Sequence, residues 1–458
     1  MGLGNPKICE LIKEYGYIID TVRHTDSTDY KSIADKVVYS WPTVKSSIDG
    51  LVEKDLLIDK KDSKTSRFFP NDSFAYFLGV SVGATECKAV ITKFNFEPIR
   101  IQDNDELYLK FKKNLESSLG NSLSDEILCF KSVCDNVEIQ DICSVIVETA
   151  LDLFEADKNH DLVAIGISLP GIIDKNNDEI SFCPNIPKFV AMPTSKILRS
   201  DLWERIDKSQ IAYHLCHDTI AATVFEKEWL YNESNPERLK KDKPNIASIY
   251  MGYGLGCGFI FNNRLMLGAS GAVGELGHIS LVYNDIESEE SDSNIIGNDD
   301  KAKYYFDGKE EDNIVFENGK CACGNVNCLE RLIRIKVFNS NSVDDFAKKT
   351  QKKHLENFHK EHPYRYKVLK QLIAQILCLI SNTLNVDIIV FSGRLLNDMP
   401  QLKRDMEGLI SKYSLTASAK YCHIISGYSK PNAVAIGASI MAYYSILSEN
   451  SKDFQINW

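Results

Sequence analysis

The chain has 458 residues, of which 44% are hydrophobic and 26% are charged, a balance that is ordinary for globular proteins. This length predicts about three domain-sized units and enough chain for a large core. The formal net charge of −11 argues against a surface that binds polyanions as a whole, although a small basic patch can still do so locally.

Cysteine usage and the first residues indicate the compartment. The 13 cysteines are scattered along the chain, and residues 1–6 lack the basic-then-apolar pattern of a secretory leader. The apolar stretch 369–391 is interrupted by lysine, glutamine, asparagine and aspartate, so we expect no membrane helix. Reduced thiols in a cytoplasmic protein fit these features best.

The first seventy residues predict a small helical domain. Apolar positions at helical spacing predict helices over Pro6–Tyr15, Tyr30–Val37 and Trp41–Glu53. Ser40 is a suitable N-cap for the third helix, in which Pro42 is tolerated in the first turn. The second and third helices have the spacing of a helix-turn-helix.

A basic hairpin follows the third helix. Leu56–Ile58 and Arg67–Phe69 are predicted strands on either side of a polar turn, which is the pattern of the wing in a winged helix. We therefore expect a DNA-binding domain over residues 1–72, and a helical interaction module with a solvated hairpin is the alternative. The residues expected to contact bases or phosphates are Thr43, Lys45, Ser46, Ser47, Lys60, Lys61, Lys64 and Arg67.

Turn residues near Pro70 end the hairpin, and an α/β body is predicted beyond them. Short runs of apolar residues predict buried strands, interspersed with helical segments and closed by a small-residue helix over Asn432–Met441. The predicted strands are Tyr76–Val82, Cys87–Thr92, Val163–Leu169, Ile211–Cys216, Ile246–Tyr250 and Asp387–Phe391.

A cysteine cluster predicts a metal site. Cys321, Cys323 and Cys328 have the spacing Cys-x-Cys-x-x-x-x-Cys, and His278 is the nearest sensible fourth ligand. Zinc prefers four such ligands in a tetrahedron, so a bound structural Zn²⁺ is predicted. The alternative is a set of unrelated core cysteines.

Two glutamates near this metal site indicate that it also binds a ligand. Glu275 precedes His278 by three residues, and Glu330 follows Cys328 by two. Zinc would hold both carboxylates beside an imidazole whose second nitrogen stays free to bond a ligand. Such groups suit a polyol with adjacent hydroxyls; the alternative is a purely structural zinc site with solvated glutamates.

The motifs Glu-x-Gly-His at 275–278 and Cys-x-Cys-Gly-x-x-x-Cys-x-Glu at 321–330 resemble those of the ROK family of repressors, open reading frames and sugar kinases. This resemblance runs from about residue 75 to 445. It implies a two-lobed actin-like (ribonuclease H-like) sugar kinase fold over residues 73–458, after the winged helix. The small lobe would cover about 73–192 plus a helix at about 431–447, and the large lobe about 193–430. An acidic stretch at about 284–318 departs from the family as an insert.

The resemblance also implies sugar-binding residues. Glu275, His278 and Glu330 match the family's sugar contacts, and Asn185 stands in the place of a further one. Asp218 matches the base that takes the sugar's proton in the kinases. His217 before it resembles the His-Asp pair of some sugar-responsive repressors of the family. The alternatives are an Asx turn for Asn185 and a helix N-cap for Asp218.

The phosphate side departs from the kinases of the family. Ser81 stands where they have aspartate, Ala84 replaces a glycine, and Tyr253 replaces a threonine in a second glycine-rich loop. Phosphoryl transfer depends on charge neutralisation and positioning at the phosphates, so we expect no competent ATP/Mg²⁺ site.

Together these features predict a sugar-responsive transcriptional regulator, most simply a repressor. It would bind operator DNA through the winged helix as a homodimer or dimer of dimers, and it would bind a small sugar effector. The alternative is an ATP-dependent hexose or amino sugar kinase with an added N-terminal domain, in which Asp218 is the base.

Overall fold

The computed structural model describes two compact units. The first comprises Met1–Ser248, Cys257–Val273 and Gly427–Trp458, and the second comprises Ile249–Gly256 and Gly274–Ser426. The residues whose structure is described are 5–24, 28–37, 39–62, 65–83, 86–99, 106–119, 128–131, 139–157, 159–174, 176–183, 186–231, 243–252, 254–280, 321, 323, 328–340, 343–428, 432–447 and 456–457. Within these ranges, no helix has the length and apolar character needed to span a bilayer.

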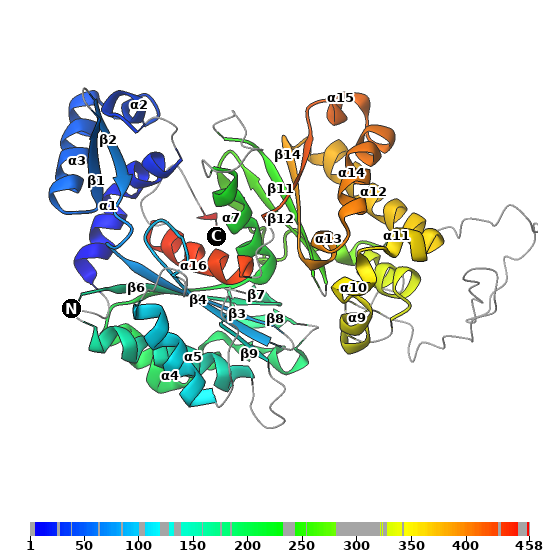
Figure 1. Ribbon diagram of the computed structural model, residues 1–458, viewed down its shortest axis with the longest axis horizontal. Helices are drawn as coiled ribbons and strands as arrows, with labels where there is room; N and C mark the ends of the chain where they lie inside the picture. Colours follow the sequence, from blue (N-terminus) through cyan, green and yellow to red (C-terminus); the bar gives the residue numbers. More distant parts are fainter. Residues whose placement is uncertain are drawn as a thin grey trace, which may run out of the picture. The chain divides into compact units, whose positions relative to one another are not determined.

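The N-terminal domain is a winged helix (Figure 1). Ser40 accepts a hydrogen bond from the Thr43 amide as the predicted N-cap of the third helix, whose Val44, Ile48 and Leu51 are buried. The first helix runs past Tyr15 because apolar residues continue at helical spacing. The domain consists of α1 (Pro6–Arg23), α2 (Tyr30–Ala34), α3 (Trp41–Glu53), β1 (Leu57–Asp62) and β2 (Thr65–Pro70).

The first unit also contains a five-stranded sheet with the order β10-β6-β3-β4-β5. β3 pairs antiparallel with β4 and parallel with β6, and β6 pairs parallel with β10. An antiparallel meander beside two parallel strands is the expected ribonuclease H-like arrangement. The strands are β3 (Tyr76–Val82), β4 (Glu86–Thr92), β5 (Leu128–Lys131), β6 (Leu162–Leu169) and β10 (Ala212–His217).

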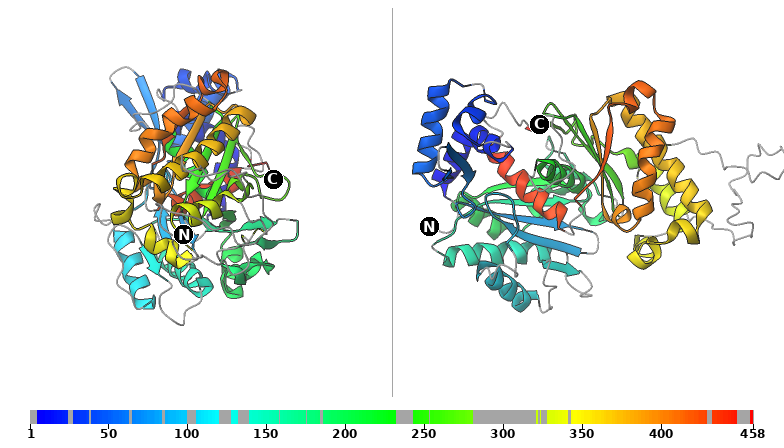
Figure 2. Two further views of the ribbon diagram at one scale, coloured as in Figure 1. Left: turned by 90° about the vertical axis from the view of Figure 1, so that its right-hand side faces the viewer. Right: turned by 45° about the horizontal axis from the view of Figure 1, so that its top comes forward.

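Helices cover both faces of this sheet (Figures 1 and 2). α4 (Glu106–Leu119) and α5 (Ile139–Ala156) lie on one face, where Phe111 and Phe154 are fully buried in the core. α16 (Ala433–Leu447) lies on the other face beside α7 (Asp218–Leu230). Gly166 permits this approach, because a Cβ there would lie 1.8 Å from the Ala438 carbonyl oxygen.

A six-stranded sheet has the order β15-β14-β11-β12-β13-β16, which repeats the first topology with one added strand. β11 and β12 both run from one unit into the other. The strands are β11 (Ile246–Met251), β12 (Leu255–Phe261), β13 (Arg264–Met266), β14 (Ile388–Ser392), β15 (His423–Ser426) and β16 (Ile456–Asn457). Two sheets of this kind define the actin-like fold that the sequence predicted.

The remaining elements are short, apart from two long helices of the second unit. In the first unit they are β7 (Ile172–Asp174), β8 (Glu179–Phe182), β9 (Met192–Pro193), α6 (Ser200–Lys208) and two 3₁₀ turns at Pro187–Phe189 and Thr194–Lys196. In the second they are a 3₁₀ turn η4 (Leu276–His278), α8 (Leu329–Leu332), a π-helix (Ile333–Val337), α9 (Val343–Lys349), α10 (Lys352–Leu355), α11 (Phe358–Glu361), α12 (Pro363–Leu384), α13 (Arg394–Asn397), α14 (Pro400–Tyr413) and α15 (Thr416–Ala419).

Candidate metal and ligand site

Two segments that are distant in the sequence meet in the second unit to form a cluster of metal-ligating side chains. His278 ends the turn η4, and Cys328 directly precedes α8. An antiparallel bridge joins Ser280 to Cys328, and the Leu329 amide donates to the Ile279 carbonyl at 3.0 Å. The backbone therefore places the histidine beside the cysteine segment.

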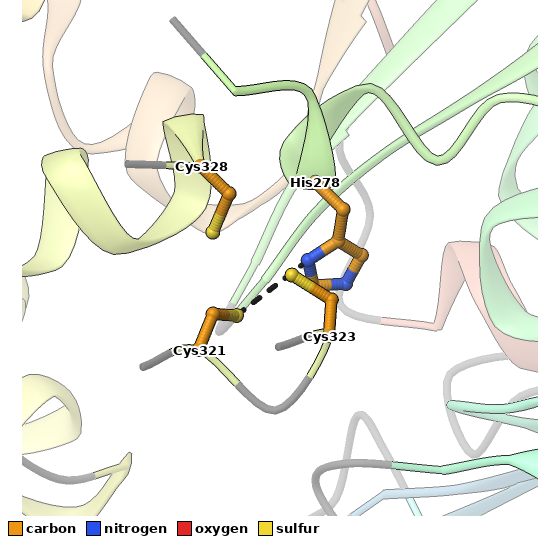
Figure 3. A group of neighbouring side chains, drawn as sticks. All are labelled: His278, Cys321, Cys323 and Cys328. Atoms are coloured by element: carbon orange, nitrogen blue, oxygen red, sulfur yellow. Dashed lines mark hydrogen bonds between the residues drawn. The ribbon is translucent and has the colours of Figure 1, made fainter. Parts of the chain in front are cut away.

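The side chains of His278, Cys321, Cys323 and Cys328 converge (Figure 3). Their sulfur and nitrogen atoms all lie within 4.8 Å of one another, and Cys321 Sγ is 3.6 Å from His278 Nδ1. A tetrahedron with Zn–S bonds of about 2.3 Å has edges of roughly 3.8 Å, so small shifts bring these atoms to bonding distance. This group, which we call the metal group, can hold a metal ion.

Acidities within the metal group favour ligation. A hydrogen bond from the Cys328 thiol lowers the pKa of Cys321 to about 3, and His278 acts in the same direction. The same shared proton raises the pKa of Cys328. The hydrogen bond with Cys321 raises the pKa of His278. The lowered pKa of Cys321 favours its thiolate, which is the form of cysteine that binds metals.

The two glutamates lie beside the metal group. His278 turns Nδ1 toward Cys321 and Nε2 toward Glu275, whose Oε2 is 3.8 Å away. Glu330 Oε2 accepts a hydrogen bond from the Leu255 amide at 3.0 Å, and its Oε1 pairs with Arg334 at 3.2 Å. The histidine can therefore ligate through one nitrogen and face a carboxylate with the other.

The predicted His-Asp pair lies in the first unit, where β10 ends and α7 begins. His217 is the N-cap residue of α7 and Asp218 is the first helical residue, so the structure does not make Asp218 the N-cap. His217 Nε2 lies 3.3 Å from Asp218 Oδ1, and Thr219 donates to the same oxygen. The partial positive charge of a helix N-terminus stabilises a carboxylate at this position.

Of the residues that depart from the kinases on the phosphate side, the structure describes only Ser81. Ser81 lies near the end of β3, half-buried, and pairs in register with Ser168 of β6, so this position carries a hydroxyl and no carboxylate. Ala84, Tyr253 and the sugar-contact candidate Asn185 lie outside the described residues, as does the acidic insert at 284–318.

Most of the predicted DNA-contacting residues are accessible. Thr43 and Ser46 are exposed on α3, whereas Lys45 and Ser47 are partly exposed. On the hairpin, Lys60, Lys61 and Arg67 are exposed, and Lys64 lies outside the described residues. Lys60 and Arg67 are direct partners in the register of β1 and β2. Like charges that face each other across strands destabilise a hairpin unless an anion lies between them.

Two features of the structure were not predicted from the sequence. Arg334 follows Glu330 by four residues on the helical segment after Cys328, and the spacing of opposite charges alone predicts that pair. The second feature is a buried group of charged residues in the first unit that involves α1, α7 and α16. No local motif marks that group, because its members come from three distant parts of the chain.

Comparison with known proteins identifies the family. The sequence profile of the ROK family matches residues 137–444, so the chain belongs to the ROK family. The resemblance read from the Glu-x-Gly-His and cysteine motifs is thereby confirmed.

Among the relatives, a putative xylose repressor of Caldicellulosiruptor sp. (strain Rt8B.4) is 21% identical over 75% of this chain and 70% of its own length. The xylose repressor of Bacillus subtilis (strain 168) is 31% identical over 27% of this chain and 28% of its own. An N-acetyl-D-glucosamine kinase of Pectobacterium carotovorum is 26% identical over 38% of this chain and 44% of its own.

One solved structure shares the fold along nearly the whole chain. It is a ROK family transcriptional regulator described as a homologue of the E. coli MLC protein, with a TM-score of 0.59 and 16% sequence identity. The match covers 96% of this chain and 98% of that structure, so both have the winged helix and the actin-like body.

Proposed function

We propose that this protein is a sugar-responsive transcriptional regulator, and most simply a repressor. It binds operator DNA through the winged helix as a homodimer, and it binds a sugar in the ROK body beside a structural zinc ion. The observation that carries this proposal is the presence, on one ROK chain, of both a winged helix and a His-Cys₃ group flanked by two glutamates.

The basic hairpin supports the DNA-binding part of the proposal. Lys60 and Arg67 face each other across β1 and β2, an arrangement that costs stability unless an anion lies between the two cations. A DNA phosphate is such an anion. Thr43 and Ser46 are exposed on α3 and carry hydroxyl groups, which suit contacts to base edges.

The sugar part rests on the residues around the metal group. When bound, zinc would fix the ring of His278 and the segment that carries Glu275. Within the second unit, the proposed sugar contacts are Glu275, His278 and Glu330. Within the first unit, the residues proposed to contact a sugar are His217 and Asp218. The relatives named xylose repressors support a sugar effector.

Regulation requires that the sugar bind two conformations with different affinity. Moving the protein from almost fully DNA-bound to almost fully released needs about a 10⁴-fold preference, or about 5.5 kcal/mol. Several hydrogen bonds to hydroxyls, some of them to charged groups at roughly 1.5–3 kcal/mol each, supply that amount.

The test is a measurement of DNA binding with and without sugar. DNA selected from random duplexes by the protein should be palindromic and bind with steep salt dependence. Removing the charges of Lys60 and Arg67 should weaken binding, and a panel containing D-xylose, D-glucose and N-acetyl-D-glucosamine should include a sugar that changes the affinity. A protein that selects no DNA sequence would refute the proposal.

A sugar kinase is the second candidate, favoured by one observation. Asp218 lies at the N-terminus of α7 with its carboxylate partly exposed, which suits a base that takes a proton from a hydroxyl. The same sugar panel with ATP and Mg²⁺ separates the two candidates. Formation of ADP at about 1 s⁻¹ or faster, within the range of ordinary enzymes, would favour the kinase.

A further inference from the structure

A buried group of charged and phenolic side chains connects the winged helix to the helix that begins at Asp218. His24, at the end of α1, lies 2.8 Å from Glu228 near the end of α7. Glu228 also pairs with Lys227 at 2.9 Å and accepts a hydrogen bond from Tyr444 of α16. Lys227 Nζ lies 3.0 Å from the Tyr444 hydroxyl. We call this set, together with Asp20, Arg23 and Tyr443, the ionic cluster.

Arg23 completes the connection on the side of α1. Its guanidinium lies 4.7, 4.2 and 4.5 Å from the ring centroids of Phe94, Phe96 and Tyr443, respectively. It pairs with Asp20 at 3.3 Å, and Asp20 accepts a hydrogen bond from the Tyr443 hydroxyl at 3.1 Å. The last turn of α1 is therefore held in one place against α16 and the turn after β4.

The side chains of the ionic cluster are largely excluded from solvent. Lys227 is 1% exposed, and the Glu228 side chain is 11% exposed. Burial alone would raise the pKa of Glu228, but Lys227, His24 and Tyr444 hold it well below its usual range. Buried ion pairs contribute little net stability, since desolvation offsets their attraction. Their stronger effect is to specify one arrangement of the elements that carry them, because removing one partner leaves another charge buried.

α7 is suited to transmit a displacement. It has no glycine or proline between Asp218 and Leu230, and nearly all its residues are buried. At about 1.5 Å per residue, roughly 15 Å separate Asp218 from Glu228 along the axis. A Cβ at Gly437 of α16 would lie 1.9 Å from the Ala221 carbonyl oxygen of α7, so the two helices pack at backbone contact. Packing this close transmits strain from one helix to the other.

We propose that α7 is the element that couples the sugar site to the DNA-binding domain. Sugar contacts at His217 and Asp218 bias the position of its first turn, and the ionic cluster transfers the displacement of its last turn to α1. This inference rests on the proposed function, since it identifies the route by which that function is regulated. In this proposal α7 acts as one rigid helix. Its N-terminal end contacts the sugar, and its C-terminal end is bonded to the winged helix through Glu228 and His24.

The test compares two variants with a matched control. Glu228→Gln removes the charge that bonds α7 to His24, and Tyr444→Phe removes a single hydroxyl from the same cluster. Asp152→Asn is the control, because it breaks a surface ion pair with Arg205 that contacts neither α1 nor α7. For each protein, the operator Kd is measured with and without the panel sugar that acts on the wild type, and the sugar Kd is measured by calorimetry without DNA.

Both variants should reduce the sugar-dependent change in operator Kd by at least tenfold, while the sugar Kd stays within about threefold of wild type, a shift of under about 0.7 kcal/mol. Asp152→Asn should keep the full response. In the wild type, sugar should also change hydrogen exchange at the amides of α1, and Tyr444→Phe should abolish that change. A variant that was merely less stable would change the operator response, the sugar Kd and the hydrogen exchange of α1 together.

Two results overturn the inference in distinguishable ways. If the wild type responds to sugar and both folded variants respond equally, the coupling does not pass through the ionic cluster, and the proposed function stands. If the wild type binds DNA but no sugar alters its affinity, the proposed function fails and this inference fails with it. Should Glu228→Gln not fold, Tyr444→Phe decides alone.

Discussion

The metal group and the ionic cluster are both built from ionisable side chains, but the first can bind a metal ion and the second pairs its charges internally. The metal group gathers four ligands whose atoms lie within 4.8 Å of one another, and only Cys328 among them is buried. The ionic cluster gathers carboxylates, cations and phenols that neutralise one another away from water. The first can bind a metal ion, whereas the charges of the second pair with one another within the fold.

This difference bears on what each region contributes. A ligand set acquires its stability from the metal, so the surrounding segment depends on that ion. A self-neutralised cluster needs no ligand and fixes the relative positions of α1, α7 and α16. The metal group therefore suits recognition, and the ionic cluster suits the transfer of a displacement between helices.

The largest effect is expected from breaking the metal group. Replacing Cys321 and Cys323 by serine removes two of four ligands, so bound zinc measured by mass spectrometry should fall to near zero. Sugar affinity should fall by roughly 10–100-fold, the usual effect of losing a group that positions site residues. Cys378→Ser is the control in the same unit and should retain both. Unchanged sugar affinity in a zinc-free protein would refute the positioning role of the metal.

Breaking the ionic cluster should cost stability and not ligand binding. Arg23→Met leaves Asp20 buried without its cation, so the free energy of unfolding should fall by about 3 kcal/mol. A surface ion pair offers a comparison: Lys45→Met, which loses the contact with Asp49, should cost under about 1 kcal/mol. Denaturant midpoints measure both values. Equal losses would mean that Arg23 is not a buried partner.

The contribution of the ionic cluster to stability should depend on pH. Because the pKa of Glu228 is held well below 4.5, its ionisation stabilises the folded state above pH 4.5, and this contribution disappears as the pH falls through the folded-state value. The difference in unfolding free energy between wild type and Glu228→Gln should therefore shrink on acidification below about pH 4.5. Asp20 contributes in the opposite sense, because burial raises its pKa and the charge of Glu228 adds to that rise. A difference that does not vary with pH would contradict the assignment.

The smallest effect is expected away from both regions. Ser40→Ala removes the N-cap of α3, whose hydrogen bond to the Thr43 amide is 3.4 Å long, so we expect a loss of about 0.5 kcal/mol. Zinc content and sugar affinity should be unchanged. Thermal unfolding checks the first statement and calorimetry the second; a change in sugar affinity would show that the winged helix influences the body without the ionic cluster.

The two regions also differ in how far the sequence predicts them. Cys321, Cys323 and Cys328 are neighbours in the chain, so their spacing indicated a metal site, and His278 followed from its own motif. The ends of β3 and α3 were predicted to the residue because periodicity and an N-cap mark them. In contrast, Asp20, Glu228 and Tyr443 come together only through the packing of three helices. Each alone reads as an ordinary surface residue or core aromatic.

The position of α16 in the sequence has a consequence for biosynthesis. This helix covers the face of the first sheet opposite α4 and α5, yet it follows β3 only after the whole of the second unit. During synthesis, the apolar face of β3 and β6 therefore stays uncovered until the second unit has been made. Chains stalled before Ala433 should therefore aggregate or bind chaperones through this surface, and the winged helix should lack its contacts with α16 until that helix has been made.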